Sequence, residues 1–106
     1  MTARSNLAAT YRATGRLQEA IALDEQVLAD RARVLGGDHP DTVTSRYNLA
    51  ADHFEAGGVA TAITLLRRVV ADRERMLGSD HPDTGAARDN LAIAQEAQLK
   101  SSRTGL

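Results

Sequence analysis

A short polar motif occurs twice in this sequence, and its residue types are those of metal sites. Asp38-His39-Pro40-Asp41 returns as Asp80-His81-Pro82-Asp83, which is a shift of 42 positions. Imidazole and carboxylate groups are ligands that zinc and manganese accept. A metal site is therefore the first chemical hypothesis that the sequence raises.

The spacing of the two motifs argues against one shared metal ion. If each motif joins two packed helices, equivalent motifs lie about 10 Å apart on neighbouring repeats, too far for a single ion. Within one motif, Pro40 stiffens the chain so that His39 and Asp41 diverge. Helix capping is the competing interpretation, because proline and aspartate are favoured in the first turn and Asp38 or His39 would be the cap. We expect no metal and no cofactor.

Nucleophilic catalysis and nucleotide binding have no better support. Ser5, Ser45 and Ser79 have no histidine partner that spacing predicts. The glycine pairs fit neither a P-loop nor a dinucleotide-binding fingerprint. The chain contains no cysteine, which excludes cysteine nucleophiles, thiolate metal sites and disulfides. We therefore expect no enzymatic activity.

Composition restricts the class of partner. The 106 residues include 13 Lys and Arg against 14 Asp and Glu, so the net charge of −1 lacks the basic excess of a nucleic-acid-binding protein. No apolar run approaches the ~20 residues that cross a bilayer, and no signal-like segment follows Met1. We expect a small cytoplasmic domain that binds neither nucleic acid nor membrane.

The polar motif is part of a longer internal repeat. The segment 34–42 matches the segment 76–84, and Arg4-Ser5-Asn6-Leu7-Ala8 is echoed at 46–50 and again at 88–92. A fixed period of this length is typical of stacked arrays, in which each unit buries its apolar face on its neighbours. Apolar residues between 18 and 35 recur at spacings of three, four and seven, which predicts helix rather than the alternating strands of a propeller blade.

Glycine and proline divide the chain into five expected helices. Gly36 and Gly78 follow the last periodic leucine of a long helix, where a left-handed residue commonly ends it. The expected helices cover residues 2–14, 17–35, 40–56, 59–77 and 82–99. They form a single expected domain over residues 1–100, with repeat units 1–37 and 38–79, a closing helix 80–100 and a flexible tail 101–106.

The pattern within each unit resembles the tetratricopeptide repeat. Leu7, Ala8 and Tyr11 match its first helix, and Ala20 matches the small residue at the helix crossing. The long period and the Leu-Gly-x-Asp-His-Pro-Asp-Thr connector resemble the kinesin-light-chain variety of this family, since the usual unit has ~34 residues. The resemblance implies an all-α, right-handed superhelix of antiparallel helix pairs, with about two and a half repeats. Similar repeats occur in bacterial signalling proteins, and the alanine- and arginine-rich composition suits a bacterial source.

The sequence departs from the family pattern in places that bear on assembly. Asp24 and Leu66 stand where a large aromatic residue is common in the second helix. The last expected helix is more polar than the others, as a closing element of an array should be. The N-terminal edge has no such cover, so a homo-oligomer formed through that edge is one expectation, and a fragment of a longer array is another.

One asparagine per unit is the best candidate for binding. Asn6, Asn48 and Asn90 each precede the core leucine of a first helix. The resemblance implies that this position lies on the concave surface, where such asparagines hold the backbone of a bound peptide. An amide side chain offers two donors and one acceptor, which match a peptide group of any sequence. The alternative is that these amides bond a neighbouring helix and only hold the stack together.

Residues beside these asparagines are the candidates for specificity. Helical spacing places Arg12, Phe54 and Ile93 on the same face, and Tyr47 adjoins Asn48. Arginine and aromatic side chains are frequent anchors of interfaces, although packing in the core is the alternative for Phe54. We expect a protein–protein interaction module that captures a peptide or partner segment. The alternative is a structural or oligomerisation module that stacks through its exposed edge helices.

Overall fold

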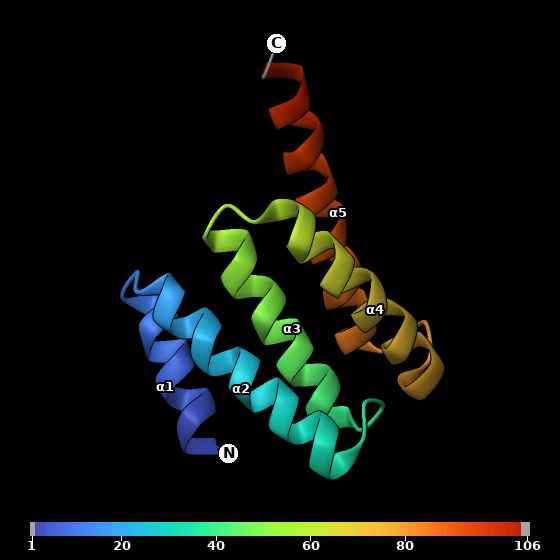
Figure 1. Ribbon diagram of the computed structural model, residues 1–106. Coiled ribbons are helices and arrows are strands. Elements are labelled where there is room, and N and C mark those ends of the chain that lie inside the picture. The colour runs from blue at the N-terminus through green and yellow to red at the C-terminus, as the bar shows by residue number, and fades with distance from the viewer. Residues whose placement is uncertain (1, 105–106) are drawn as a thin grey trace.

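Five helices in antiparallel succession make up the described chain (Figure 1). The computed structural model describes residues 2–104, and within them there is no strand. The helices are α1 (Thr2–Ala13), α2 (Leu17–Leu35), α3 (Pro40–Glu55), α4 (Val59–Leu77) and α5 (Pro82–Thr104). Four of the five lie within two residues of their expected bounds, which confirms the all-α prediction. No helix of the described chain is long and apolar enough to cross a membrane.

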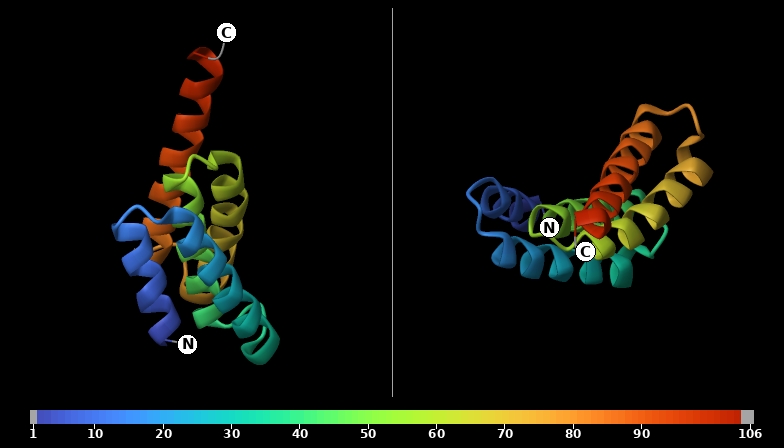
Figure 2. Two further views of the ribbon diagram at one scale, coloured as in Figure 1. Left: turned by 60° about the vertical axis from the view of Figure 1, so that its left-hand side comes forward. Right: turned by 90° about the horizontal axis from the view of Figure 1, so that it is seen from above.

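The helices form two layers that curve as a short arc. Seen from above, α2 and α4 lie along the outer side of the arc, and α1 and α5 lie along the inner side (Figure 2, right). Each helix packs mainly on its neighbours in sequence. We call the packing of the α1–α2 pair on α3 the first joint, and the packing of the α3–α4 pair on α5 the second joint.

Alanines are buried at equivalent positions of both helix pairs. Ala8 of α1 and Ala20 of α2 are buried, and so are their equivalents Ala50 and Ala62 in α3 and α4. A methyl side chain lets two helix backbones approach closely, and larger side chains interlock around the crossing. These buried alanines explain why the repeat keeps small residues at the same positions in both units.

The connectors after α2 and α4 repeat their backbone geometry and their hydrogen bonds. Gly36 and Gly78 have φ values of 95° and 91°, in the left-handed region that side chains with a Cβ rarely adopt. The buried hydroxyl of Thr42 donates to the carbonyl of Gly36 at 2.8 Å, and that of Thr84 donates to Gly78 at 2.9 Å. Each connector is thus closed by a threonine of the helix that follows it.

The histidine of each polar motif caps the next helix. The Nδ1 atom of His39 accepts from the backbone N–H of Asp41 at 3.1 Å, and His81 accepts from Asp83 at 3.0 Å. Of the two caps that the sequence allowed, the histidine is therefore the one used. Among the described residues, no group of three His, Asp or Glu side chains is arranged to hold a metal ion.

An arginine of each first helix pairs with an aspartate of the second helix in the same repeat. The Arg4–Asp30 pair has an N–O distance of 2.7 Å, with side chains 34% and 38% exposed. The equivalent pair, Arg46–Asp72, lies at 3.3 Å with both side chains only 6% exposed. The same contact is therefore partly hydrated in the first repeat and almost dry in the second.

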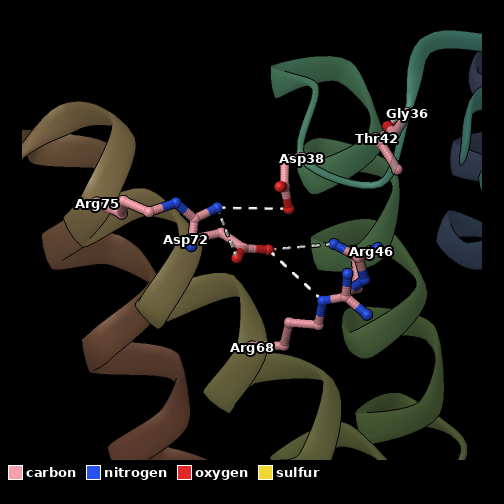
Figure 3. A network of polar contacts seen from close by, with 7 residues as sticks. All are labelled: Gly36, Asp38, Thr42, Arg46, Arg68, Asp72 and Arg75. Atoms are coloured by element: carbon pink, nitrogen blue, oxygen red, sulfur yellow. Dashed lines mark hydrogen bonds and ion pairs between the residues drawn. The ribbon is translucent and has the colours of Figure 1, made fainter.

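The buried pair of the second repeat is the centre of a larger network (Figure 3). Asp72 is approached by Arg46 from α3 and by Arg68 and Arg75 from its own helix. Arg75 also reaches Asp38 of the preceding connector at 3.4 Å. Burial and the nearby charge of Arg68 lower the pKa of Arg46, and Asp72 opposes this shift. The network ties α3, α4 and the connector before α3 together.

The last helix is longer than the sequence suggested. α5 continues to Thr104, whereas its expected end was residue 99 and the segment from 101 was expected to be a flexible tail. No glycine or proline interrupts the chain between Gly85 and Gly105, and Lys100 pairs with Glu96 one turn earlier at 3.9 Å. Figure 1 shows this end of α5 extending beyond the other helices. Residues 105 and 106 of the expected tail lie outside the described part.

Replacing Thr42 by valine tests the connector. The change keeps the shape of a buried side chain but removes the donor to Gly36, so we expect the free energy of unfolding to fall by about 1–2 kcal/mol. Thr44→Val, on an exposed position of the same helix, is the matched control and should change it by less than about 0.5 kcal/mol. Chemical denaturation measures both; equal effects would contradict the role given to Thr42.

Replacing Asp72 by asparagine tests the buried network. The change leaves Arg46 as a buried charge without its partner, and we expect a loss of about 3–5 kcal/mol in unfolding free energy. Asp30→Asn breaks the equivalent but hydrated pair and should cost at most about 1 kcal/mol. If the two variants unfold at the same denaturant concentration, burial is not what makes the second pair important.

Candidate functional site

The three asparagines lie along the seam between successive first helices. The guanidinium of Arg12 in α1 donates to the backbone carbonyl of Asn48 in α3 at 3.5 Å, so this part of α3 faces α1. The side-chain amide of Asn90 in α5 donates to the hydroxyl of Tyr47, so the matching part of α5 faces α3. Asn6 is at the equivalent position of α1, the first helix of the described chain.

The three side-chain amides differ in whether they have a hydrogen-bond partner within the fold. Asn90 is held by Tyr47. The side chains of Asn6 and Asn48 form no hydrogen bond with any other described residue, although Asn6 is exposed and Asn48 is half-buried. Asn90 thus matches the stacking interpretation, because its bond to Tyr47 joins two repeats. Peptide binding by Asn6 and Asn48 stays a prediction.

Arg12 is used by the first joint. Its Nη1 atom lies 3.0 Å from Oδ1 of Asp52, a carboxylate of α3 that is completely buried. The side chain of Arg12 is 25% exposed. This arginine is therefore paired with a buried carboxylate within the fold, and its role as a specificity residue stays a prediction.

Phe54 and Tyr47 are used by the second joint. Phe54 packs on a buried cluster that includes Ile63, Leu66 and Ala94, so the packing alternative describes its position. Tyr47 touches the same cluster, and the guanidinium of Arg73 lies 4.6 Å from the centre of its ring. Both aromatic side chains stabilise the stacking of α3–α4 on α5.

Ile93 is the candidate specificity residue that the fold leaves open. Its side chain on α5 is 55% exposed, and the residues equivalent to it in α1 and α3 are Ala9 and Ala51. A further apolar feature is a cavity of about 120 Å³ between the start of α3 and the end of α4, with Val43, Met76 and Leu77 in its wall. None of the three asparagines is among the residues that line this cavity.

A buried polar cluster at the first joint joins one expected site residue, Arg12, to two aspartates that were not expected there. It consists of Arg12 from α1, Asp24 from α2 and Asp52 from α3, and both aspartates are buried. Burial, together with a hydrogen bond to Asp52 and the charge of Asp52, raises the pKa of Asp24 to about 8. Arg12 and Arg31 oppose this shift. The sequence signal for the cluster is that the repeat fails at these positions, because the residues 42 positions later are apolar.

An arginine of each second helix donates a hydrogen bond to a carbonyl of the next polar motif in both repeats, but the residues around this contact differ. Arg31 donates to the carbonyl of Asp41 at 3.1 Å, and Arg73 donates to that of Asp83 at 3.0 Å. Arg31 also donates to the hydroxyl of Ser45 at 2.6 Å, whereas Arg73 stacks on an aromatic ring. Beside this shared contact the first repeat thus has a serine hydroxyl and the second an aromatic ring.

Comparison with known proteins agrees with this architecture. The family model of the tetratricopeptide repeat matches residues 1–75. Two crystal structures of kinesin-light-chain-like TPR repeats from Podosopora anserina, the second of them a variant of the first, superpose on the chain with a TM-score of 0.85 and 36% sequence identity. No curated protein matches the sequence.

The similar repeat proteins are longer than this chain. Each superposition covers 95% of this chain and 48% of the similar one, so the chain spans about half the length of those repeat proteins. Repeats of this kind generally mediate protein–protein interactions. From its repeat period, its connectors, its helix pairs and these matches, the chain belongs to the tetratricopeptide-repeat family, and its repeats are similar to those of the kinesin-light-chain-like structures.

Proposed function

We propose that this chain is a non-catalytic, cytoplasmic interaction module that binds an extended peptide segment along the seam of α1, α3 and α5. The observation that carries the proposal is the half-buried side-chain amide of Asn48, which has no hydrogen-bond partner among the described residues. A polar group in such a position is stabilised when a ligand supplies a donor and an acceptor. A peptide backbone supplies both.

The neighbourhood of Asn48 suits a chain that lies along the seam. Asn6 offers a second free amide on the preceding first helix, and Ile93 offers an exposed apolar side chain on the following one. The cavity beside Val43, at the start of α3, would take one side chain of a ligand that continues toward that end of the helix. Backbone recognition by amides and side-chain recognition by an apolar cavity are the usual division of labour in the binding of extended peptides.

Self-association is the second candidate function, and an exposed leucine favours it. Leu7 on α1 is 44% exposed, whereas its equivalent Leu49 on α3 is 6% exposed because neighbouring helices pack on both sides of α3. An exposed apolar face on an edge helix can bury itself on a second molecule. The two functions differ in the surface they use, because the edge of α1 is distinct from the seam.

Replacing Asn48 by alanine tests peptide binding. Peptides selected from a random display library on the 106-residue chain serve as ligands, and fluorescence anisotropy gives their Kd. Loss of one hydrogen bond of about 1 kcal/mol should weaken binding about fivefold, with a change in Tm of no more than about 2 °C. Unchanged affinity would contradict the proposal, and a large fall in Tm would make Asn48 a structural residue.

Two variants serve as controls for this experiment. Gln26→Ala removes an exposed amide from α2, on the outer side of the arc, and should leave both affinity and Tm unchanged. Asn90→Ala breaks the bond to Tyr47 and should lower the unfolding free energy by about 1 kcal/mol. The contrast between Asn48 and Asn90 separates a free amide from one that holds the stack together.

Light scattering after size-exclusion chromatography tests self-association. The peptide-binding function predicts the monomer mass of 11.3 kDa at every concentration up to the millimolar range. A mass that rises with concentration in the original chain, and returns to the monomer value in a Leu7→Lys variant, would instead support association through the edge of α1. A rise that Leu7→Lys leaves unchanged would exclude that edge as the interface.

A further inference from the structure

The two joints of the array are built on the same frame with opposite chemistry. Three positions at the centre of the first joint are Arg12, Asp24 and Asp52. The positions 42 residues later, at the centre of the second joint, are Phe54, Leu66 and Ala94. The second joint therefore serves as an internal control for the first, because helix geometry is shared and only the side chains differ.

Only one oxygen atom of the Asp52 carboxylate accepts a hydrogen bond from the described residues. Its Oδ1 atom accepts from Arg12 at 3.0 Å, while Oδ2 is buried and has no hydrogen-bond donor among the described N–H and O–H groups. A buried carboxylate oxygen without a donor is costly. Asp24 lies against Asp52, and in its protonated form it is a donor to this carboxylate. The proton on Asp24 thus completes the hydrogen bonding of the joint.

The charges around this proton are few and come from all three helices. α1 contributes Arg12, α2 contributes Arg31 in addition to Asp24, and α3 contributes Asp52. Arg31 is directed to Ser45 and to the carbonyl of Asp41, so only Arg12 contacts the carboxylate pair directly. With Asp24 neutral, Arg12 and Asp52 balance each other. Without its proton, Asp24 adds a second buried negative charge that this single guanidinium must share.

We propose that the first joint is a proton-dependent contact: the α1–α2 pair is held on α3 while Asp24 carries a proton, and it loosens when that proton is lost. The second joint has apolar residues at the same positions and stays closed. The proton-dependent contact is therefore confined to the α1–α2 end of the array. Opening exposes Asp24 to water, where its charge is hydrated, and leaves α3, α4 and α5 packed.

The direction of the pH effect follows from the raised pKa of Asp24. In the open or unfolded chain this group titrates near 3.8, whereas in the closed joint it titrates near 8. Its contribution to stability is complete below the lower value, falls as pH rises between the two, and is lost above the upper one. The joint is thus tightest in mild acid and loosens toward alkaline pH.

Opening of the joint would also affect the surface proposed for binding. Asn6 and Asn48 belong to α1 and α3, so the two free amides lie on opposite sides of the first joint. Their separation would disrupt a site that spans both helices. This consequence rests on the function proposed above, whereas the joint itself is tested without any ligand.

Hydrogen exchange followed by mass spectrometry tests the proposal on the intact chain. Protection factors, corrected for the intrinsic effect of pH on exchange, are compared between α1–α2 and α4–α5 from about pH 5 to about pH 9. We expect the protection of α1–α2 to fall with rising pH by up to about tenfold per unit below about pH 8, while that of α4–α5 stays constant. A parallel fall in both halves, or constant protection in α1–α2, would overturn the proposal.

Two variants and one direct titration complete the test. Asp24→Asn keeps a donor for Asp52 and cannot ionise, so protection of α1–α2 should no longer depend on pH in this range. The triple variant Arg12→Phe, Asp24→Leu, Asp52→Ala copies the second joint into the first and should behave in the same way. Persistence of the pH dependence in a folded variant would contradict the role of Asp24. In the original chain, a carboxyl carbon resonance of Asp24 that titrates near the ordinary 3.8 instead of near 8 would do so without any substitution.

Discussion

A single helix pair of this chain cannot enclose a core, and the whole structure depends on burying small and apolar residues between successive pairs. Ala8, Ala20, Ala50 and Ala62 are buried within the two helix pairs, and the joints then bury what each pair leaves open. The side chains that differ between the two joints have to pack within the space that these contacts leave. The connectors, closed by glycine and threonine, hold the pairs at the spacing that the joints require.

The two joints show how one frame accommodates different chemistry. The second joint buries Phe54 against Leu66 and Ala94, and its energy comes from apolar contact. The first joint buries an ion pair and a second carboxyl group, which are stable only while their charges and hydrogen bonds are satisfied. Stability is therefore unevenly distributed along the array, and the N-terminal pair is the part whose attachment responds to solution conditions.

The helices could be predicted from the sequence because their ends depend on nearby residues: glycine, proline and a repeated connector. The predicted end of α5 was wrong because polar residues that continue a helix look like those of a tail. The site was predicted less well, for a physical reason. Helical spacing places Arg12 and Phe54 on one face, but whether such a side chain is free depends on Asp52 in one case and Ala94 in the other, contacts made across the joints. Asn48 and Asn90 occupy equivalent positions in the repeat, and only the neighbouring Tyr47 distinguishes the amide that the fold uses from the free one.

We propose that binding uses the hydrogen-bonding groups that folding leaves without a partner along the seam of the first helices. The most direct test is a titration of the ¹⁵N-labelled chain with a selected peptide, observed through the side-chain amide resonances of its asparagines. The resonances of Asn6 and Asn48 should shift as the peptide binds, together with backbone amides of α1, α3 and α5. Shifts confined to the outer helices α2 and α4, with the amide of Asn48 unaffected at saturation, would contradict the account.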